Sequence, residues 1–155
     1  MTKEIKPINP VPSTATAKEV SEIGRIVYDV FDEGIRFIIM RGPYHWCAYI
    51  GIPVEHPLAG MSYDDMSINA HGGLTFSAKG GGKKKNEEDI LWPEGYWWYG
   101  WDYGHSGDYS HFEHRPEKMM EDDKDWTIDE VIKDSMDTIY DFKKLLKLAG
   151  KIKLK

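Results

Sequence analysis

The run YWWYGWDY, residues 96–103, constrains the fold more than any other part of the chain. Successive side chains of a β-strand point to opposite faces of the sheet. As a strand, this run places Trp97, Tyr99, Trp101 and Tyr103 on one face and Tyr96, Trp98, Gly100 and Asp102 on the other. So many aromatic side chains on one face predict a core beneath a covering helix. On the opposite face, Trp98 and Asp102 flank a gap at Gly100, an arrangement that suits a nucleobase or a ribose.

The C-terminal segment is predicted to supply the covering helix. Thr127 and Glu130 form the capping-box pattern that typically begins a helix. Helical spacing then continues through Ile128, Val131, Ile132, Met136, Ile139, Phe142, Leu146 and Ala149. Gly150 is a typical stop signal, so residues 151–155 are predicted to form a tail.

The N-terminal third is predicted to contain a shorter helix. Residues 1–13 hold three prolines and are predicted to form an irregular arm. A second capping-box pattern runs from Thr16 to Glu19. The apolar residues that follow recur at spacings of three and four: Val20, Ile23, Val27, Val30 and Phe31. We therefore expect an N-terminal helix that ends at Gly34.

The middle of the chain is rich in strand patterns. Two β-rich runs flank Arg41-Gly42-Pro43 and predict a hairpin, and the run INAHGGLTFSA predicts a further strand. Residues 79–90, rich in glycine and lysine, predict a mobile loop. The expected fold is α+β: a single domain over residues 14–150, with an antiparallel sheet of four to six strands, an N-terminal helix, and a long C-terminal helix packed on one face.

Composition excludes several classes of protein. The formal net charge of −6 argues against a nucleic-acid partner, because phosphate contacts need a basic face. The apolar runs are too short to cross a membrane and the N-terminus lacks a signal-peptide pattern, so we expect a cytoplasmic protein. A single cysteine, Cys47, rules out an intramolecular disulfide and is expected to be buried in a strand. Arg41 is one of only four arginines and is a candidate phosphate ligand.

Two polar motifs are the candidate sites of chemistry. In HGGLTF, Gly72 and Gly73 follow His71, and their amides are candidates to hold an anion. The alternative is that the glycine pair only shapes a bulge. In GWDYGHSGD, Asp102, His105 and Asp108 recur at intervals of three. Here the histidine is a candidate acid, base or ligand that carboxylates orient, and a divalent metal held by these three residues is a further option.

Taken together, the motifs HWCAYIGIP, HPLAG, HGGLTF and WWYGWDYGHSGD resemble a widespread family of small, largely uncharacterised bacteriophage and prophage proteins. The resemblance covers residues 41–149. It implies a phage accessory protein that acts in the cytoplasm of the bacterial host. The positions that match the motifs are His45, Trp46, Cys47, Tyr49, His56, His71, Gly72, Gly73, Thr75, Trp97, Trp98, Asp102, His105, Gly107 and Asp108.

Three functional hypotheses follow from these residues. In the first, the protein sequesters a nucleotide-derived signal of bacterial immunity. Trp98 or Trp46 would stack on the base, Arg41 and the glycine amides would hold phosphate, and Asp102 and His105 would meet ribose. The remaining candidate ligand-binding residues are His45, His56, Thr75 and Asp108.

The second hypothesis is a hydrolase of such a molecule. His71 and His105 would be its acid and base, Asp102 would assist, and Asp102 and Asp108 would hold any metal. The third is a protein–protein inhibitor of a host defence enzyme. Homo-oligomerisation stays open.

Overall fold

A computed structural model describes residues 2–4, 11–86, 90–105, 108 and 123–153. Six antiparallel strands form one sheet in the order β1-β2-β3-β4-β6-β5. The strands span Thr2–Glu4 (β1), Ile26–Asp32 (β2), Ile35–Arg41 (β3), Trp46–Pro53 (β4), Phe76–Lys79 (β5) and Tyr96–Asp102 (β6). Two single turns of 3-10 helix, η1 (Ala17–Glu19) and η2 (Tyr63–Asp65), lie in the connections.

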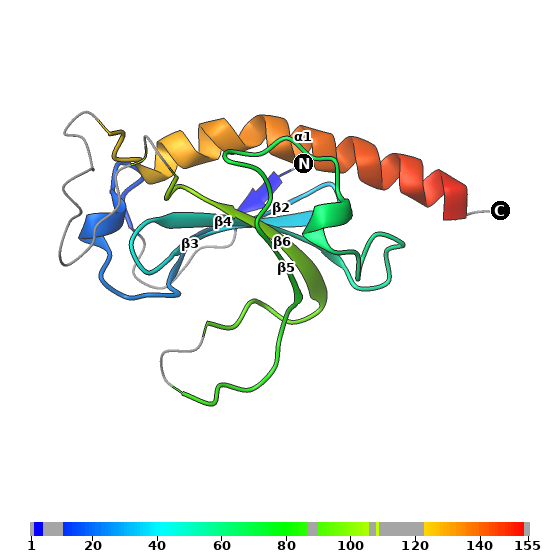
Figure 1. The fold of residues 1–155 in the computed structure, drawn as a ribbon, viewed down its shortest axis with the longest axis horizontal. Helices are drawn as coiled ribbons and strands as arrows, with labels where there is room; N and C mark the ends of the chain where they lie inside the picture. Colours follow the sequence, from blue (N-terminus) through cyan, green and yellow to red (C-terminus); the bar gives the residue numbers. More distant parts are fainter. Residues whose placement is uncertain (1, 5–10, 87–89, 106–107, 109–122, 154–155) are drawn as a thin grey trace.

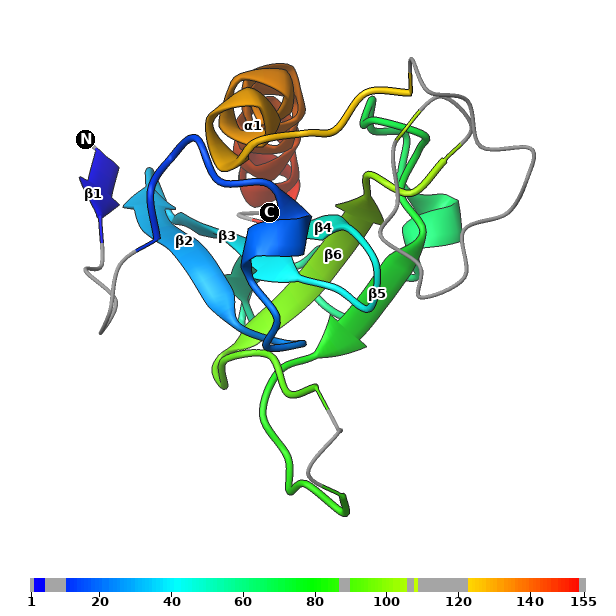
Figure 2. The same cartoon turned by 90° about the vertical axis from the view of Figure 1, so that its left-hand side faces the viewer.

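The helix α1, Ile128–Lys153, lies across one face of the sheet (Figure 1). The core between the two layers contains Trp46, Tyr99, Trp101 and Tyr103 from the sheet and Phe142 from the helix. The single α+β domain with a long C-terminal helix is therefore confirmed. Figure 2 looks along α1 and shows the strands fanning out beneath it.

The beginning of α1 is joined to the N-terminal part of the chain. The predicted capping box forms, because the backbone N–H of Thr127 donates to Glu130 Oε1 at 3.1 Å and that of Glu130 donates to Thr127 Oγ1 at 3.2 Å. Two further backbone amides of the first turn donate hydrogen bonds to carbonyls that are far away in the sequence. The N–H of Ile128 donates to the carbonyl of Ala15 at 3.0 Å, and that of Asp129 donates to the carbonyl of Ser13 at 2.8 Å.

The predicted N-terminal helix is wrong. Its capping box does form, with Thr16 N–H donating to Glu19 Oε1 at 3.2 Å, but it caps only the single turn η1. The residues beyond become β2 because they pair with β3 through a tight turn at Glu33-Gly34. Both turn residues have positive φ, 46° and 88°, which is the geometry of a two-residue hairpin turn. Gly34 thus closes a hairpin and does not end a helix.

Three other boundaries also differ from expectation. Thr2–Glu4, inside the predicted irregular arm, pairs with β2 as strand β1. The strand predicted from INAHGGLTFSA begins only at Phe76, because His71 to Gly73 form a turn. The final helix continues through Gly150 to Lys153. Residues 80–86 and 90–95 lead away from the sheet and back, as both views show (Figures 1 and 2).

The side chains of β6 alternate between the two faces of the sheet, as predicted, and both faces are buried at this strand. Away from α1, Cys47, Tyr49 and Trp98 form a second apolar cluster with Met40 and Ile38. The gap expected at Gly100 is filled, since a Cβ at this glycine would lie 2.4 Å from the Tyr49 ring. Burial raises the pKa of the Cys47 thiol to about 12, as expected for an unreactive cysteine in a strand.

In the part of the chain that the structure describes, no helix is both long enough and apolar enough to cross a membrane.

Candidate functional site

A compact group of polar and aromatic side chains lies where β6 ends, beside the start of α1. We call this group the histidine cluster; it consists of His71, Asp102, Tyr103, His105, Asp108, Trp126 and Asp134. His71 comes from the turn before β5 and Asp102 from the end of β6. Tyr103, His105 and Asp108 follow β6, Trp126 lies just before α1, and Asp134 lies in α1. The sequence prediction that His71 lies near Asp102, His105 and Asp108 is consistent with this arrangement.

Asp108 is the centre of the cluster. Its Oδ2 accepts hydrogen bonds from His71 Nε2 at 2.7 Å and from the backbone N–H of His105 at 3.1 Å. Its Oδ1 accepts from the indole N–H of Trp126 at 2.8 Å. Only 5% of this residue is exposed. Both carboxylate oxygens therefore have protein donors, and Asp108 holds three separate chain segments together.

His71 is held in one orientation. Its ring stacks on Tyr103, with centroids 4.5 Å apart and planes within 13°, and the Trp126 ring packs against its edge. Since Nε2 donates to Asp108, the neutral imidazole carries its lone pair on Nδ1. Nδ1 lies 4.0 Å from Asp134 Oδ2, which also accepts a hydrogen bond from the Tyr103 hydroxyl at 2.8 Å. Burial raises the pKa of Tyr103, so its hydroxyl stays protonated and remains a donor.

His105 lies next to His71 and has a carboxylate of its own. The two imidazole centroids are 5.9 Å apart, and His105 Nε2 lies 3.3 Å from Asp102 Oδ1. That contact is an ion pair when the imidazole is protonated, but it is not aligned as a hydrogen bond. Among the described residues, this buried Nε2 has no hydrogen-bond partner. The cluster thus contains two neighbouring imidazoles, each beside a carboxylate.

Gly72 allows the two histidines to approach each other. It has φ of +70°, and a Cβ at this position would lie 2.3 Å from the His105 ring. The adjacent Gly73 has φ of +84° but no atom within 4 Å of its Cβ position. Its amide donates to the carbonyl of Ala70 at 2.9 Å, which closes a turn and leaves this amide unavailable to an anion. The glycine pair therefore lies in a turn and not in the bulge of the alternative interpretation, and the Gly73 amide is used within that turn.

Comparing Gly72→Ala with Gly73→Ala tests this packing. Both substitutions put a side chain on left-handed backbone and should each cost about 1–2 kcal/mol. Only Gly72→Ala also displaces the His105 ring. We expect Gly72→Ala to lose more stability than Gly73→Ala in urea unfolding, and the His105 ring resonances in an NMR spectrum to shift markedly in Gly72→Ala alone. Equal spectral changes in the two variants would contradict the contact.

Three predicted ligand-binding residues have structural roles outside the cluster. Arg41 is buried, and its guanidinium donates to the carbonyls of Ala17, Val20 and Gly42, so it is not an available phosphate ligand. The His56 ring joins its loop to the helix, because Nε2 lies 3.3 Å from the carbonyl of Leu146. Thr75 pairs through its backbone N–H with the carbonyl of Gly100 at 2.9 Å.

Neither predicted stacking tryptophan is available to a ligand. Trp46 is 1% exposed and Trp98 is 0% exposed. The indole N–H of Trp98 donates to the carbonyl of Pro93 at 2.9 Å, and that of Trp46 donates to the carbonyl of Trp126 at 2.9 Å. Trp46 thus contacts the cluster through its hydrogen bond to the backbone of Trp126. His45 packs against the cluster at Gly104, where an added Cβ would lie 2.3 Å from its ring.

The predicted metal site does not form in the described part of the chain. Asp102, His105 and Asp108 are close in space, but no group of three His, Cys, Asp or Glu side chains there could hold a metal ion. The physical reason is that both oxygens of Asp108 already accept hydrogen bonds from His71, His105 and Trp126.

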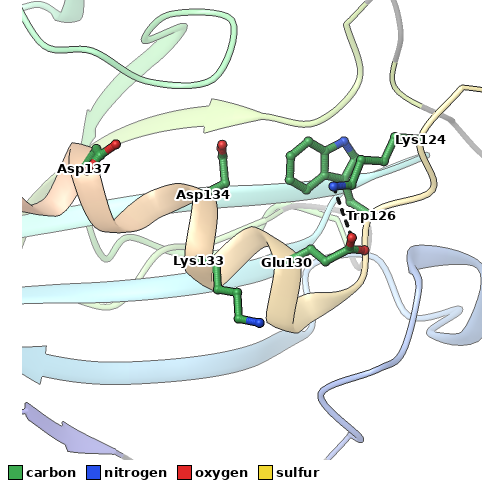
Figure 3. A pocket seen from close by; sticks show the side chains of 6 residues that line it. All are labelled: Lys124, Trp126, Glu130, Lys133, Asp134 and Asp137. Carbon is green, nitrogen blue, oxygen red and sulfur yellow. Dashed lines mark ion pairs between the residues drawn. The ribbon is translucent and has the colours of Figure 1, made fainter.

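Trp126 and Asp134 were missed as site residues by sequence reasoning. Both also line an open depression of about 500 Å³, together with Lys124, Glu130, Lys133 and Asp137 (Figure 3). Lys124 Nζ lies 4.1 Å from the Trp126 ring centroid and 3.1 Å from Glu130 Oε2. The one available signal was a tryptophan directly before the capping box at Thr127. Asp134, whose Oδ2 lies 4.0 Å from His71 Nδ1, therefore belongs both to the cluster and to the lining of the depression.

Comparisons with protein-family models, with curated proteins and with solved structures find no match to this chain.

Proposed function

We propose that the histidine cluster is an acid–base site that hydrolyses a small molecule. The observation that carries the proposal is the pair of imidazoles 5.9 Å apart, each beside its own carboxylate. Hydrolysis needs one group to take a proton from water and another to give a proton to the leaving group. Two adjacent histidines can supply both, because an imidazole changes protonation near neutral pH.

The two histidines have different surroundings, and these suit different roles. Asp108 accepts from Nε2 of His71 at 2.7 Å and so leaves the lone pair on Nδ1, on the side of the ring that faces Asp134, which suits a general base. Nε2 of His105 lies 3.3 Å from Asp102 Oδ1 and has no hydrogen-bond partner among the described residues, so we assign His105 the role of general acid. As the base gains its proton, Asp108 also stabilises the imidazolium that forms. No step requires a metal.

The proposed substrate is a nucleotide-derived signalling molecule in the cytoplasm of a bacterial host. The resemblance to phage accessory proteins supports this class. Carboxylates accept hydrogen bonds from sugar hydroxyls, and Asp102 and Asp134 are placed beside the imidazoles to do so. Within the described residues the cluster contains no arginine, so ribose is a better fit than phosphate for direct contact.

Sequestration without hydrolysis is the second candidate. The open depression beside the cluster favours it, because the Trp126 indole and the Lys124 ammonium group offer a stacking surface and a positive charge. This candidate has lost the stacking tryptophans Trp46 and Trp98 and the phosphate ligand Arg41, which all have structural roles. By contrast, both histidines predicted for acid–base chemistry, His71 and His105, lie together in the cluster.

One experiment separates the candidates. The protein is incubated with a panel of cyclic nucleotides and ADP-ribose derivatives, separated by filtration, heated, and both fractions are analysed by chromatography. Hydrolysis predicts altered molecules that His71→Gln protein does not produce, whereas His56→Gln protein, changed outside the cluster, still produces them. Intact ligand released only on heating supports sequestration. No depletion of any compound contradicts both and favours a protein–protein inhibitor.

A further inference from the structure

The outward side of α1 carries an exposed apolar stripe. Met136, Tyr140 and Leu148 are 58%, 62% and 58% exposed. They are three of the six exposed large hydrophobic side chains among the described residues. Positions four apart on a helix form one ridge, and Lys144 fills the remaining place on this ridge. Met136, predicted from its spacing to face the core, belongs to this exposed stripe instead.

Charge is segregated along the same helix. Acidic residues predominate before Phe142, namely Asp129, Glu130, Asp134, Asp137 and Asp141, whereas Lys143, Lys144 and Lys147 follow it. The helix dipole accounts for charges in the first and last turns only, because its effect fades beyond them. Asp137 and Asp141, four apart, repel each other within one helix, as do Lys143 and Lys147. Among the described residues Asp137 has no ion-pair partner within 4.0 Å. Lys143 and Lys147 already lie near carboxylates of their own chain, Lys143 Nζ 2.6 Å from Asp32 Oδ2 and Lys147 Nζ 3.9 Å from Glu33 Oε2. A second helix of opposite direction would bring its Lys147 to Asp137.

We propose that α1 is the interface of a homodimer, in which it packs antiparallel against α1 of a second copy. A two-fold axis level with Phe142 places Met136 opposite Leu148 of the partner subunit. The same axis places Asp137 opposite Lys147 of the partner subunit, and Tyr140 opposite Lys144 of the partner subunit. One axis therefore pairs apolar with apolar, acid with base, and an aromatic ring with a cation.

The arrangement of the fold leaves this side of α1 accessible. The sheet lies on one side of the helix (Figures 1 and 2), and Met136, Tyr140 and Leu148 are each more than half exposed, so their ridge is turned away from the sheet. Lys144 Nζ already lies 5.5 Å from the Tyr140 ring of its own chain, so a second helix enters an existing cation–aromatic contact. A single helix pair buries less surface than a standard interface. We therefore expect a dimer that dissociates on dilution.

Charge exchange tests the proposal. Sedimentation velocity over a wide concentration range should show a monomer–dimer equilibrium for the unmodified chain. Asp137→Lys places two lysines opposite each other at both ends of the interface, and Lys147→Asp places two aspartates there. Each single variant should weaken the dimer about tenfold or more, because like charges in an interface are strongly unfavourable.

Mixing the two single variants should restore the dimer. In the mixed pair, each lysine at position 137 or 147 of one chain again faces an aspartate of the other. The Asp137→Lys/Lys147→Asp double variant should also dimerise. Lys84→Asp, an equal change of charge on the exposed glycine- and lysine-rich loop, serves as the control and should dimerise like the unmodified protein.

A chain that is monomeric at all concentrations would overturn the proposal. So would single variants that dimerise normally, or a mixture of the two that stays monomeric. Thermal unfolding of each variant verifies that the exposed substitutions leave the fold intact.

Discussion

A His105→Ala variant is expected to lose hydrolytic turnover by roughly 10²–10⁴-fold, the usual contribution of a positioned acid or base. The fold should survive the change. Within the described residues, Nε2 of this histidine makes no hydrogen bond, and the side chain is 35% exposed. We expect the free energy of unfolding to fall by no more than about 1–2 kcal/mol. Turnover of a substrate identified from the nucleotide panel, together with urea unfolding, measures the two effects separately.

Histidine 45 provides the matched control for this prediction. Its ring lies against Gly104 at the edge of the cluster, but it has no carboxylate beside it among the described contacts. His45→Ala should therefore change turnover far less than His105→Ala. Extensive unfolding of His105→Ala, or equal losses of turnover in both variants, would assign His105 a structural role instead.

Replacing Asp108 with asparagine is expected to have the largest effect on stability. The carboxylate is buried and accepts three hydrogen bonds, from His71, Trp126 and the backbone of His105. An amide of the same shape turns an N–H₂ group toward at least one of these donors, which leaves a buried polar group unsatisfied. We expect a loss of about 2–4 kcal/mol. For a domain of this size, that corresponds to a melting temperature lower by roughly 5–15 °C.

Asp102→Asn is the matched control, since it makes the same chemical change in the same cluster. The Asp102 side chain is 27% exposed and accepts a single backbone hydrogen bond, from Gly104 at 3.0 Å. A partly exposed group of this kind contributes about 1 kcal/mol or less. Calorimetric melting temperatures should thus rank the variants as Asp108→Asn well below Asp102→Asn. Equal melting temperatures would contradict the central position of Asp108.

Local patterns predicted the helix from Ile128 and the alternating faces of β6, because each of these depends on periodicity within one segment. The spacing of apolar residues also led to a wrong prediction, since the segment that forms strand β2 was predicted to be part of a helix. Val27 and Val30 are both buried, so they satisfy helical spacing as well as a buried strand. Pairing with β3 decided the outcome, and that pairing depends on the turn at Glu33-Gly34. A residue's partner across a sheet is not encoded in its own neighbourhood.

The candidate site was predictable to a similar degree. Glycine-rich backbone around His71 and Asp102–Asp108 marked the loops that meet in the cluster. The expected roles of Trp46, Trp98 and Arg41 failed for one physical reason: large side chains with polar tips are as useful in a core as in a binding site. All three are buried and hydrogen-bonded to backbone carbonyls. Trp126 and Asp134 join the cluster only through the packing of α1, which motif spacing alone does not reveal.

The bonds between the start of α1 and residues 13–15 also affect how the chain folds during synthesis. On the ribosome, α1 emerges after every strand of the sheet. Until α1 has been synthesised, the carbonyls of Ser13 and Ala15 lack the helix amides that donate hydrogen bonds to them. The aromatic face of the sheet around Trp101 also lacks the helix that packs on it. A nascent chain without α1 therefore exposes the apolar side chains that the helix covers, a state that favours aggregation and chaperone binding.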